Sequence, residues 1–289
     1  MSFSEIIMKH EPAIRLSFFF GMLVLVAGWE YLFPRRERRY TRLLRWSNNL
    51  GLTFFNTFAA RGVFLLIGMT SVQAAMGFRE MGWGLFNINH LPSWLEILLT
   101  VLILDFFIYV QHVMVHAVPL LWRLHRVHHA DPDYDVTTGA RFHPLEIILS
   151  LFIKLGAIFF LGAPPAGVLV FEIVLNATAM FNHGNIRLPG AIDRVLRLCI
   201  VTPDMHRVHH STRADEANSN FGFNLPWWDR IFGTYRSQPR EGHEGMDIGI
   251  ATIREPKQTV WITGLLSMPF AGGSAKYTVN RSRDGETEK

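Results

Sequence analysis

Long apolar runs dominate the first 180 positions of the chain. One uncharged run covers Leu16–Trp29, and a second covers Gly62–Phe78. A third run, Trp94–Val118, holds Asp105 near its middle. Because about 20 apolar residues form a helix that crosses a bilayer, each run predicts a membrane-spanning helix. Buried core helices of a large soluble protein are the alternative, which several runs of this length disfavour.

A fourth apolar stretch, Leu145–Met180, is long enough for two crossings. It is broken at Ala163-Pro164-Pro165, where proline removes a backbone donor and restricts the preceding residue. The stretch therefore predicts a helical hairpin, and the long side chain of Lys154 can reach an interface from within it.

Basic residues between the runs predict the orientation of the helices. The segment after the first run carries Arg35, Arg36, Arg38, Arg39, Arg42 and Arg45, and the segment after the third carries Arg123, Arg126 and Arg141. The segment after the second run holds only Arg79. Lys and Arg gather on the cytoplasmic side, so we expect the N-terminus outside and the first and third connections in the cytoplasm. The first run continues into a basic stop, which favours an uncleaved anchor over a signal peptide.

Composition narrows the choice of protein class. The 289 residues are 49% hydrophobic and 18% charged, which argues against disorder. A single cysteine, Cys199, excludes disulfide scaffolds and multi-cysteine metal sites. The net charge of +4 is explained by topology and lipid headgroups, and no basic module indicates a nucleic-acid partner.

These patterns predict an all-α integral membrane bundle with a cytoplasmic, histidine-rich helical cap. We expect an N-terminal anchor region with two spans at residues 1–93 and a histidine-rich domain at residues 94–240. Residues 241–289 are expected to form an interfacial segment and a mobile tail. Within that last region, Val260–Phe270 is too short to span and predicts either an interfacial segment or a piece of the core.

Most of the 13 histidines fall into spaced groups. One pair has the spacing i, i+4, and two triplets have the spacing i, i+3, i+4, which places their side chains on one face of a helix. These histidines are His112 and His116, then His125, His128 and His129, and finally His206, His209 and His210. His183 adds a ninth imidazole, and His143 is a possible tenth. His10, His90 and His243 match no pattern.

The number of histidines points to two metal ions. A structural zinc takes about four ligands and a catalytic zinc about three, so eight to ten imidazoles exceed what one metal uses. Imidazole binds iron, zinc, copper and nickel alike, and ligand type alone therefore does not name the metal.

Polar residues in the spans extend the same pattern. Asp105 and Tyr109 share a helical stripe with the His112 pair, and Glu172 and Asn176 share one with His183. A carboxylate in a bilayer should face the bundle interior, and metal-bound histidines usually donate to a carboxylate or carbonyl. We therefore expect Asp105 and Glu172 to support or ligate the metals. The candidate catalytic residues are Asp105, Tyr109, His143, Glu172 and Asn176.

The order, spacing and flanks of these motifs resemble the fatty acid hydroxylase superfamily, also called the sterol desaturase family. The resemblance covers roughly Leu95–Tyr235, and the first two spans and the tail lie outside it. The matching segments are His112-x-x-x-His116, Leu121–His129, Arg141–Glu146, Asn182–Asn185, His206–His210 and Asn220–Arg230.

The resemblance implies a di-iron enzyme that uses dioxygen and external electrons to hydroxylate or desaturate lipid C–H bonds. Residues 94–240 would be its catalytic domain, with the active site on the cytoplasmic face. The implied ligands are His112, His116, His125, His128, His129, His183, His206, His209 and His210. Electrons would come from a separate cytochrome b5-like or ferredoxin-like protein, or from a reduced pterin, and the metal can be zinc in isolated protein.

Hydroxylation of a fatty acyl chain, a sterol or an ether lipid is the leading hypothesis. Desaturation by the same centre is its nearest rival. A transition-metal transporter would spread its histidines along a pathway through the membrane, whereas these are expected to gather at one face. A zinc-bound protein without catalytic activity is the remaining alternative.

Overall fold

The structure is a computed structural model that describes residues 8–67, 69–89 and 91–272. Five helical segments are long and apolar enough to cross a membrane. They are α2 (Glu11–Leu32), the segment that begins with α3 (Arg42–Ile67), α6 (Ser93–Ala117), α8 (Pro144–Leu161) and α9 (Pro165–Asn182). Within the described part of the chain the only β pairing is three isolated bridges. The all-helical membrane bundle is therefore confirmed.

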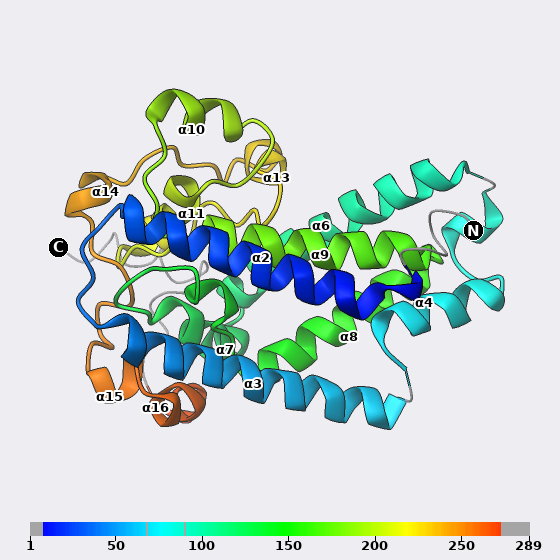
Figure 1. Cartoon of the computed structure of the whole chain (residues 1–289), viewed down its shortest axis with the longest axis horizontal. Helices are drawn as coiled ribbons and strands as arrows, with labels where there is room; N and C mark the ends of the chain where they lie inside the picture. Colours follow the sequence, from blue (N-terminus) through cyan, green and yellow to red (C-terminus); the bar gives the residue numbers. More distant parts are fainter. Residues whose placement is uncertain (1–7, 68, 90, 273–289) are drawn as a thin grey trace.

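Shorter helices connect and cap these segments (Figure 1). Between the spans lie α4 (Ser71–Glu80), α5 (Leu85–Ile88), α7 (Pro119–His129) and η1 (Thr138–Ala140). The cap after α9 contains α10 (Gly190–Leu196), α11 (Pro203–His209), α12 (Ala214–Ala217), α13 (Trp227–Ile231), α14 (Gly242–Gly245), α15 (Pro256–Thr259), α16 (Ile262–Ser267) and η2 (Met268–Phe270).

The bundle packs most tightly where α6 crosses α9. A Cβ atom on Gly167 would lie 2.9 Å from the Cβ of Thr100, so a small residue is needed at this crossing. Buried residues of α4, α6, α8 and α9 form the largest apolar core beside it, among them Val72, Leu104, Ile158 and Leu169. This core holds the spanning helices in register and so fixes where their polar ends lie.

The predicted hairpin is confirmed, including its break. His143 caps α8 by accepting a hydrogen bond from the Leu145 amide at 3.2 Å. The helix ends at Gly162, whose φ of 62° is the left-handed conformation typical of a helix end. Pro165 then begins α9.

The second predicted span is wrong in its boundaries. Gly62–Phe78 is not one helix, because α3 ends at Ile67 and α4 begins at Ser71 after a capping box formed by Thr70 and Gln73. The crossing helix α3 instead begins at Arg42 and includes Arg45, both of which the sequence placed in a connection. Arg45 is only 1% exposed. Its charge therefore belongs to a buried network inside the protein. Counting the Lys and Arg residues between apolar runs does not distinguish such a residue from one in an exposed connection.

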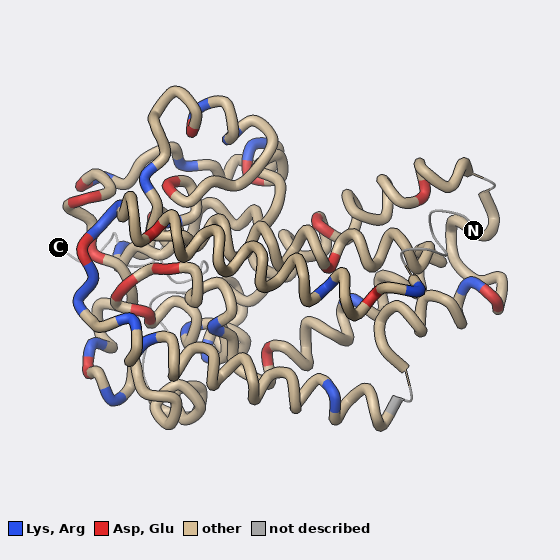
Figure 2. The backbone as a smooth tube through the Cα atoms, viewed as in Figure 1, with Lys and Arg blue, Asp and Glu red and all other residues tan. Residues whose placement is uncertain are grey.

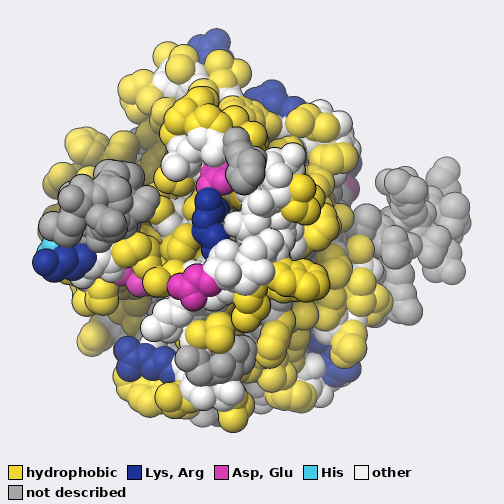
Figure 3. Space-filling view, turned by 90° about the vertical axis from the view of Figure 1, so that its right-hand side faces the viewer, with side chains coloured by type: hydrophobic (Ala, Val, Ile, Leu, Met, Phe, Trp, Pro, Cys, Tyr) yellow, Lys and Arg dark blue, Asp and Glu magenta, His cyan; other side chains and the backbone are white. Residues whose placement is uncertain are grey.

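Charged residues are concentrated at one end of the long axis of the molecule. Figure 2 shows most charged residues at the end that carries α10, α14 and α15, while the long helices between the ends carry few. Figure 3 looks onto the opposite end, where hydrophobic side chains cover most of the face. Met81, Trp83, Ile88 and Trp94 are exposed in the segment from α4 to α6. This distribution is typical of an integral membrane protein with one large polar end.

The segment Val260–Phe270 forms part of the core on one side. Leu265 and Met268 are buried against Leu52 of α3 and Trp122 and Val127 of α7. The inner face of this segment is therefore part of the core, which is one of the two alternatives that the sequence predicts for it. The tail expected at Asn280–Lys289 lies outside the described residues.

Candidate metal centre

Nine buried histidines gather at the polar end of the bundle. Within each of two groups, one ligand atom from every residue lies within 4.8 Å of the others. The larger group contains His112, His116, His125, His129 and His209, and we call it the five-histidine group. The smaller one contains His128, His183, His206 and His210, and we call it the four-histidine group. These are the nine residues that the sequence singled out.

Helical spacing explains how the triplets serve both groups. In α7, His125 and His129 reach the five-histidine group, whereas His128, one position away, reaches the other. At α11 the division is reversed, because His209 alone joins the five-histidine group. The groups are neighbours: the rings of His129 and His210 stack with centroids 4.5 Å apart.

Fixed acceptors orient five of the imidazoles. Their Nδ1 atoms face a carbonyl, amide or carboxylate oxygen, so each must donate a proton from Nδ1. The pairs are His112 with Phe221 O at 2.7 Å, His116 with Asn218 Oδ1 at 3.3 Å, His125 with Glu146 Oε1 at 2.6 Å, His183 with Ala179 O at 2.7 Å and His209 with Ser219 O at 2.8 Å. A neutral imidazole that donates from Nδ1 carries a bare lone pair on Nε2.

The bare nitrogens face one another, and this arrangement fits metal ions. The Nε2 atoms of His112 and His125 are 3.2 Å apart although both rings donate elsewhere. Two lone pairs at that distance repel unless a cation lies between them. In the other group, the Nε2 atom of His183 lies 3.1 Å from those of His128 and His206. The donor set is therefore that of a metal centre with imidazole ligands.

Burial also keeps the imidazoles in the form that binds metals. Loss of hydration lowers the pKa of five histidines outside the spanning helices well below the usual value: His128, His129, His206, His209 and His210. For His183, burial lowers the pKa to about 4. Neutral imidazole is the form that coordinates a metal.

The loop at residues 218–222 supplies three of these five acceptors, which belong to Asn218, Ser219 and Phe221. Asn220 has a φ of 52°, the only positive value among the described residues other than glycine. This turn presents the carbonyl groups of Ser219 and Phe221 to two histidines on different helices. Asp229 holds the loop by accepting hydrogen bonds from the amides of Phe221 and Gly222, both at 2.8 Å.

Two predicted carboxylates lie elsewhere. Asp105 accepts hydrogen bonds from Trp228 Nε1 at 2.8 Å and from the Asn224 amide at 3.3 Å. Glu172 pairs with Arg15 at 2.5 Å and with Lys154. Neither contacts the histidines it was expected to support, because each has a closer partner that helical stripes do not reveal.

The other candidate residues also make contacts of their own. Tyr109 hydrogen-bonds to Thr234 Oγ1 at 3.0 Å, and Asn176 donates to the carbonyl of Glu172 at 2.8 Å. His143 caps α8 and faces the carbonyl of Leu266 at 3.2 Å, outside both histidine groups. Sequence analysis did not identify Glu146 as the acceptor for His125. Its position in the Arg141–Glu146 motif could have indicated that role.

Glu146→Ala is expected to weaken metal binding by about 10- to 100-fold, because it removes the acceptor that fixes the tautomer of His125. Glu146→Gln keeps an acceptor oxygen and should lose less. The exposed Glu80→Ala is the control. Metal content measured by mass spectrometry after dialysis against a graded chelator checks this, and equal retention in Glu146→Ala and Glu80→Ala would contradict it.

A mostly apolar cavity of about 330 Å3 reaches the supports of both groups. Its inner end includes Glu146, which bonds His125, and Ala179, whose carbonyl bonds His183. A Cβ on Gly139 would lie 2.5 Å from that carbonyl oxygen, so glycine closes the cavity floor there. At the other end lie Phe19 of α2 and the exposed Thr57 of α3. The cavity thus lies between the spanning helices and reaches residues that support the histidines, although no histidine is among its lining residues.

Comparison with known proteins supports the same interpretation. Residues 97–234 match the family model described as fatty acid hydroxylase. Residues 97–234 of this chain therefore belong to the fatty acid hydroxylase superfamily. The matched range contains all nine clustered histidines and the loop that supports them.

Several curated proteins are similar to this chain over part of their length. Ornithine lipid hydroxylase OlsE of Rhizobium tropici is 30% identical over 213 residues, which cover 73% of this chain and 60% of the relative. Human alkylglycerol monooxygenase is 29% identical over 61% of this chain and 39% of its own length. Human cholesterol 25-hydroxylase is 27% identical over 49% and 52%. The chain therefore spans less than two thirds of each, and no solved structure matches it.

Proposed function

We propose that this protein is a membrane oxygenase that hydroxylates a C–H bond of a lipid. The observation that carries the proposal is the pair of buried histidine groups, whose bare nitrogens face one another, next to a mostly apolar cavity lined by residues of the spanning helices and by the supports of two of the histidines. The names of the relatives, which act on ornithine lipid, alkylglycerol and cholesterol, favour a lipid substrate.

We assign a separate role in this reaction to each group of residues. The nine histidines hold two metal ions, proposed to be iron, while Glu146 and the loop around Asn220 hold the rings in the required tautomer. The bound metals supply the activation of dioxygen, because side chains alone cannot oxidise an unactivated C–H bond. Phe142, stacked on His128 with centroids 4.4 Å apart, separates the cavity from the four-histidine group.

The reaction is balanced by an external reductant. One atom of dioxygen enters the C–H bond as hydroxyl, and the other leaves as water with two protons and two electrons. The side chains of the histidine site cannot replenish those electrons after each turnover, so we propose a separate donor, either a cytochrome b5-like or ferredoxin-like protein or a reduced pterin.

The test is conversion of lipid by purified, iron-loaded protein. With dioxygen and a reductant, membrane lipid extract should yield species heavier by one oxygen, and the label from ¹⁸O₂ should appear in the product. Species lighter by two hydrogens would favour desaturation instead. Tight stoichiometric zinc with no oxygen-dependent product would overturn the proposal.

We also propose that the histidine end faces the cytoplasm, since the first connection carries Arg35, Arg36 and Arg39 on that side. Asp247→Cys in a Cys199→Ser background places a thiol at a side chain that is 60% exposed. A membrane-impermeant maleimide should label it in inverted vesicles and not in intact cells. The reverse pattern would contradict this orientation.

Polar groups in the cavity are expected to select substrates that carry an O–H or N–H group. Among the described residues, Asn56 Oδ1 and Gln111 Oε1 are buried without a hydrogen-bond partner, and Asn56 Nδ2 is committed to the carbonyl of Phe142 at 2.9 Å. Asn56→Leu should reduce kcat/KM about tenfold for such lipids, the value of a buried hydrogen bond. Thr57→Ala is the control, and an equal loss with a lipid lacking a donor would contradict the idea.

A further inference from the structure

A second pocket lies on the cap, apart from the histidine groups. Its volume is about 610 Å3, and five arginines contribute to its lining: Arg35, Arg187, Arg194, Arg197 and Arg230. Three carboxylates also line it, those of Asp193, Asp204 and Glu244. The lining therefore has an excess of positive charge, which the proposed oxidation of a lipid does not use.

The carboxylates are already paired with three of the arginines. Asp193 pairs with Arg197 at 2.7 Å, Asp204 with Arg35 at 3.3 Å, and Glu244 with both Arg35 and Arg187 at 2.8 Å. Within the described part of the chain, Arg194 and Arg230 make no ion pair. Arg230 donates one hydrogen bond, to the carbonyl of Arg197 at 3.0 Å, and lies over the ring of Tyr235. The charges of both guanidinium groups are thus without a carboxylate partner and can be balanced by an anion in the pocket.

Arg197 adds a buried donor to the same pocket. Its side chain is 5% exposed, and its Nη1 atom donates to the carbonyl of Ser237 at 2.6 Å. Its Nη2 atom is buried and has no hydrogen-bond partner among the described residues. A buried guanidinium nitrogen without a partner is costly, and an anionic ligand would satisfy it.

Helix α13 packs against the spanning helix α6, and α10 lies next to α13. Trp228 and Phe232, in and after α13, contact Phe106 in the middle of the spanning helix α6, with centroids 4.9 and 6.0 Å apart. Trp227 Nε1 joins α13 to α10 by donating to the carbonyl of Leu198 at 2.7 Å. Figure 1 shows α10 and α13 beside the bundle rather than beyond its end.

Both helices expose apolar side chains around the pocket. Six of them are between 41% and 66% exposed: Ile192, Val195, Leu198, Trp227, Ile231 and Phe232. On α10, Ile192 and Val195 are exposed, while Arg194 and the C-cap residue Arg197 line the pocket. A short helix that combines an apolar face with arginines is typical of a segment lying in the membrane interface.

We propose that this pocket binds the phosphate of an anionic phospholipid, with Arg194, Arg197 and Arg230 as its partners and the lipid chains along the apolar face of α10 and α13. Guanidinium groups form strong, charge-assisted hydrogen bonds with phosphate. The contact of α13 with the middle of the spanning helix α6, together with the exposed apolar side chains around the pocket, favours a membrane lipid over a soluble phosphate compound. The site is separate from the proposed oxidation and stands without it.

The test compares lipid binding by the full chain in detergent. After delipidation, native mass spectrometry measures the dissociation constants of short-chain phosphatidylglycerol and phosphatidylcholine. We expect tighter binding of phosphatidylglycerol, and about 30-fold weaker binding of it in Arg194→Ala/Arg230→Ala. The matched control is Arg213→Ala/Arg240→Ala, which removes two arginines of the cap that lie outside the pocket and pair with Asp215.

Three outcomes would overturn the proposal. One is equal loss in both double variants, which would indicate a general effect of charge. Another is equal binding of the two lipids. The third is competition by inorganic phosphate at the concentration at which phosphatidylglycerol binds, which would indicate a soluble ligand. Thermal unfolding of each variant in the same detergent separates loss of the site from loss of the fold.

Discussion

Alanine at His128 or His209 is expected to strip metal from one histidine group each and to abolish lipid hydroxylation. His128 belongs to the four-histidine group and His209 to the five-histidine group. Loss of a single support for a ligand costs about 10- to 100-fold in metal affinity or activity. Loss of a ligand should cost at least as much, so activity should fall below ~1%.

The two variants also separate the groups. Metal analysis should give about one ion per protein instead of two in each variant, with a different group emptied in each. His10→Ala, at an exposed position before α2, is the matched control and should retain both ions. Full activity in either His128→Ala or His209→Ala would refute the assignment of nine ligands to two metals.

The sequence was sufficient to predict the clustering because helical spacing is a local property. Residues at i, i+3 and i+4 share a face whatever the rest of the fold does. What the spacing did not reveal is that His128 and His129 serve different groups, since this depends on where α11 packs against α7. Repeated motifs thus identified the histidines that cluster, and tertiary packing distributed them between the two groups.

The two carboxylates that we expected to support the metals contact other partners, for a physical reason. Asp105 and Glu172 lie on the correct helical stripes, yet Trp228 and Arg15 approach them from segments distant in the sequence. Glu146 takes the expected role at His125 because α8 packs beside α7. A buried carboxylate binds whichever donor the fold brings within reach, and one sequence does not contain that information.

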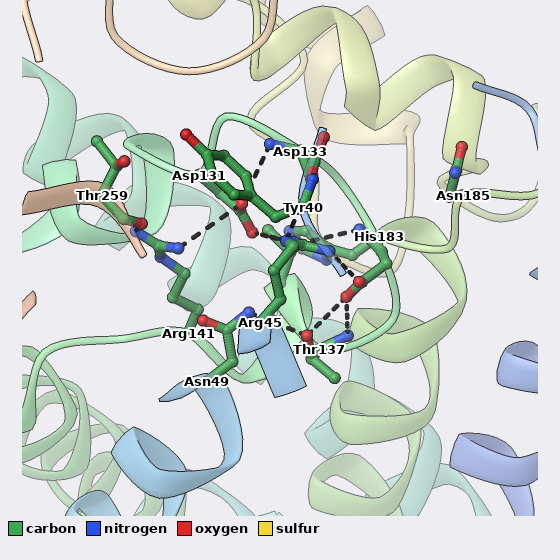
Figure 4. A network of polar contacts seen from close by, with 12 residues as sticks. Tyr40, Arg45, Asn49, Asp131, Asp133, Thr137, Arg141, His183, Asn185 and Thr259 are labelled. Atoms are coloured by element: carbon green, nitrogen blue, oxygen red, sulfur yellow. Dashed lines mark hydrogen bonds and ion pairs between the residues drawn. The ribbon is translucent and has the colours of Figure 1, made fainter. Parts of the chain in front are cut away.

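The largest effect on stability is expected from Arg45→Ala. The Arg45 side chain is 1% exposed and contacts three aspartates that follow the first histidine triplet. It pairs with Asp131 at 2.6 Å, with Asp133 at 3.7 Å and with Asp135 (Figure 4). Although burial opposes it, Arg45 and Arg141 together lower the pKa of Asp131. The Asp131 carboxylate is therefore charged, and Arg45 compensates it.

Removing Arg45 leaves that charge buried without its main partner, which typically costs about 3–5 kcal/mol. The segment it holds also carries Gly139 and Phe142 at the floor of the cavity, so metal retention should decline together with stability. Denaturant titration in detergent micelles measures the free energy of unfolding. Arg39→Ala is the control, because its pair with Asp247 is more than half exposed on both sides and should contribute about 0–1 kcal/mol. A loss in Arg45→Ala no larger than in Arg39→Ala would show that the aspartates are neutral or hydrated, and that the network does not stabilise the segment between the histidines and the cavity.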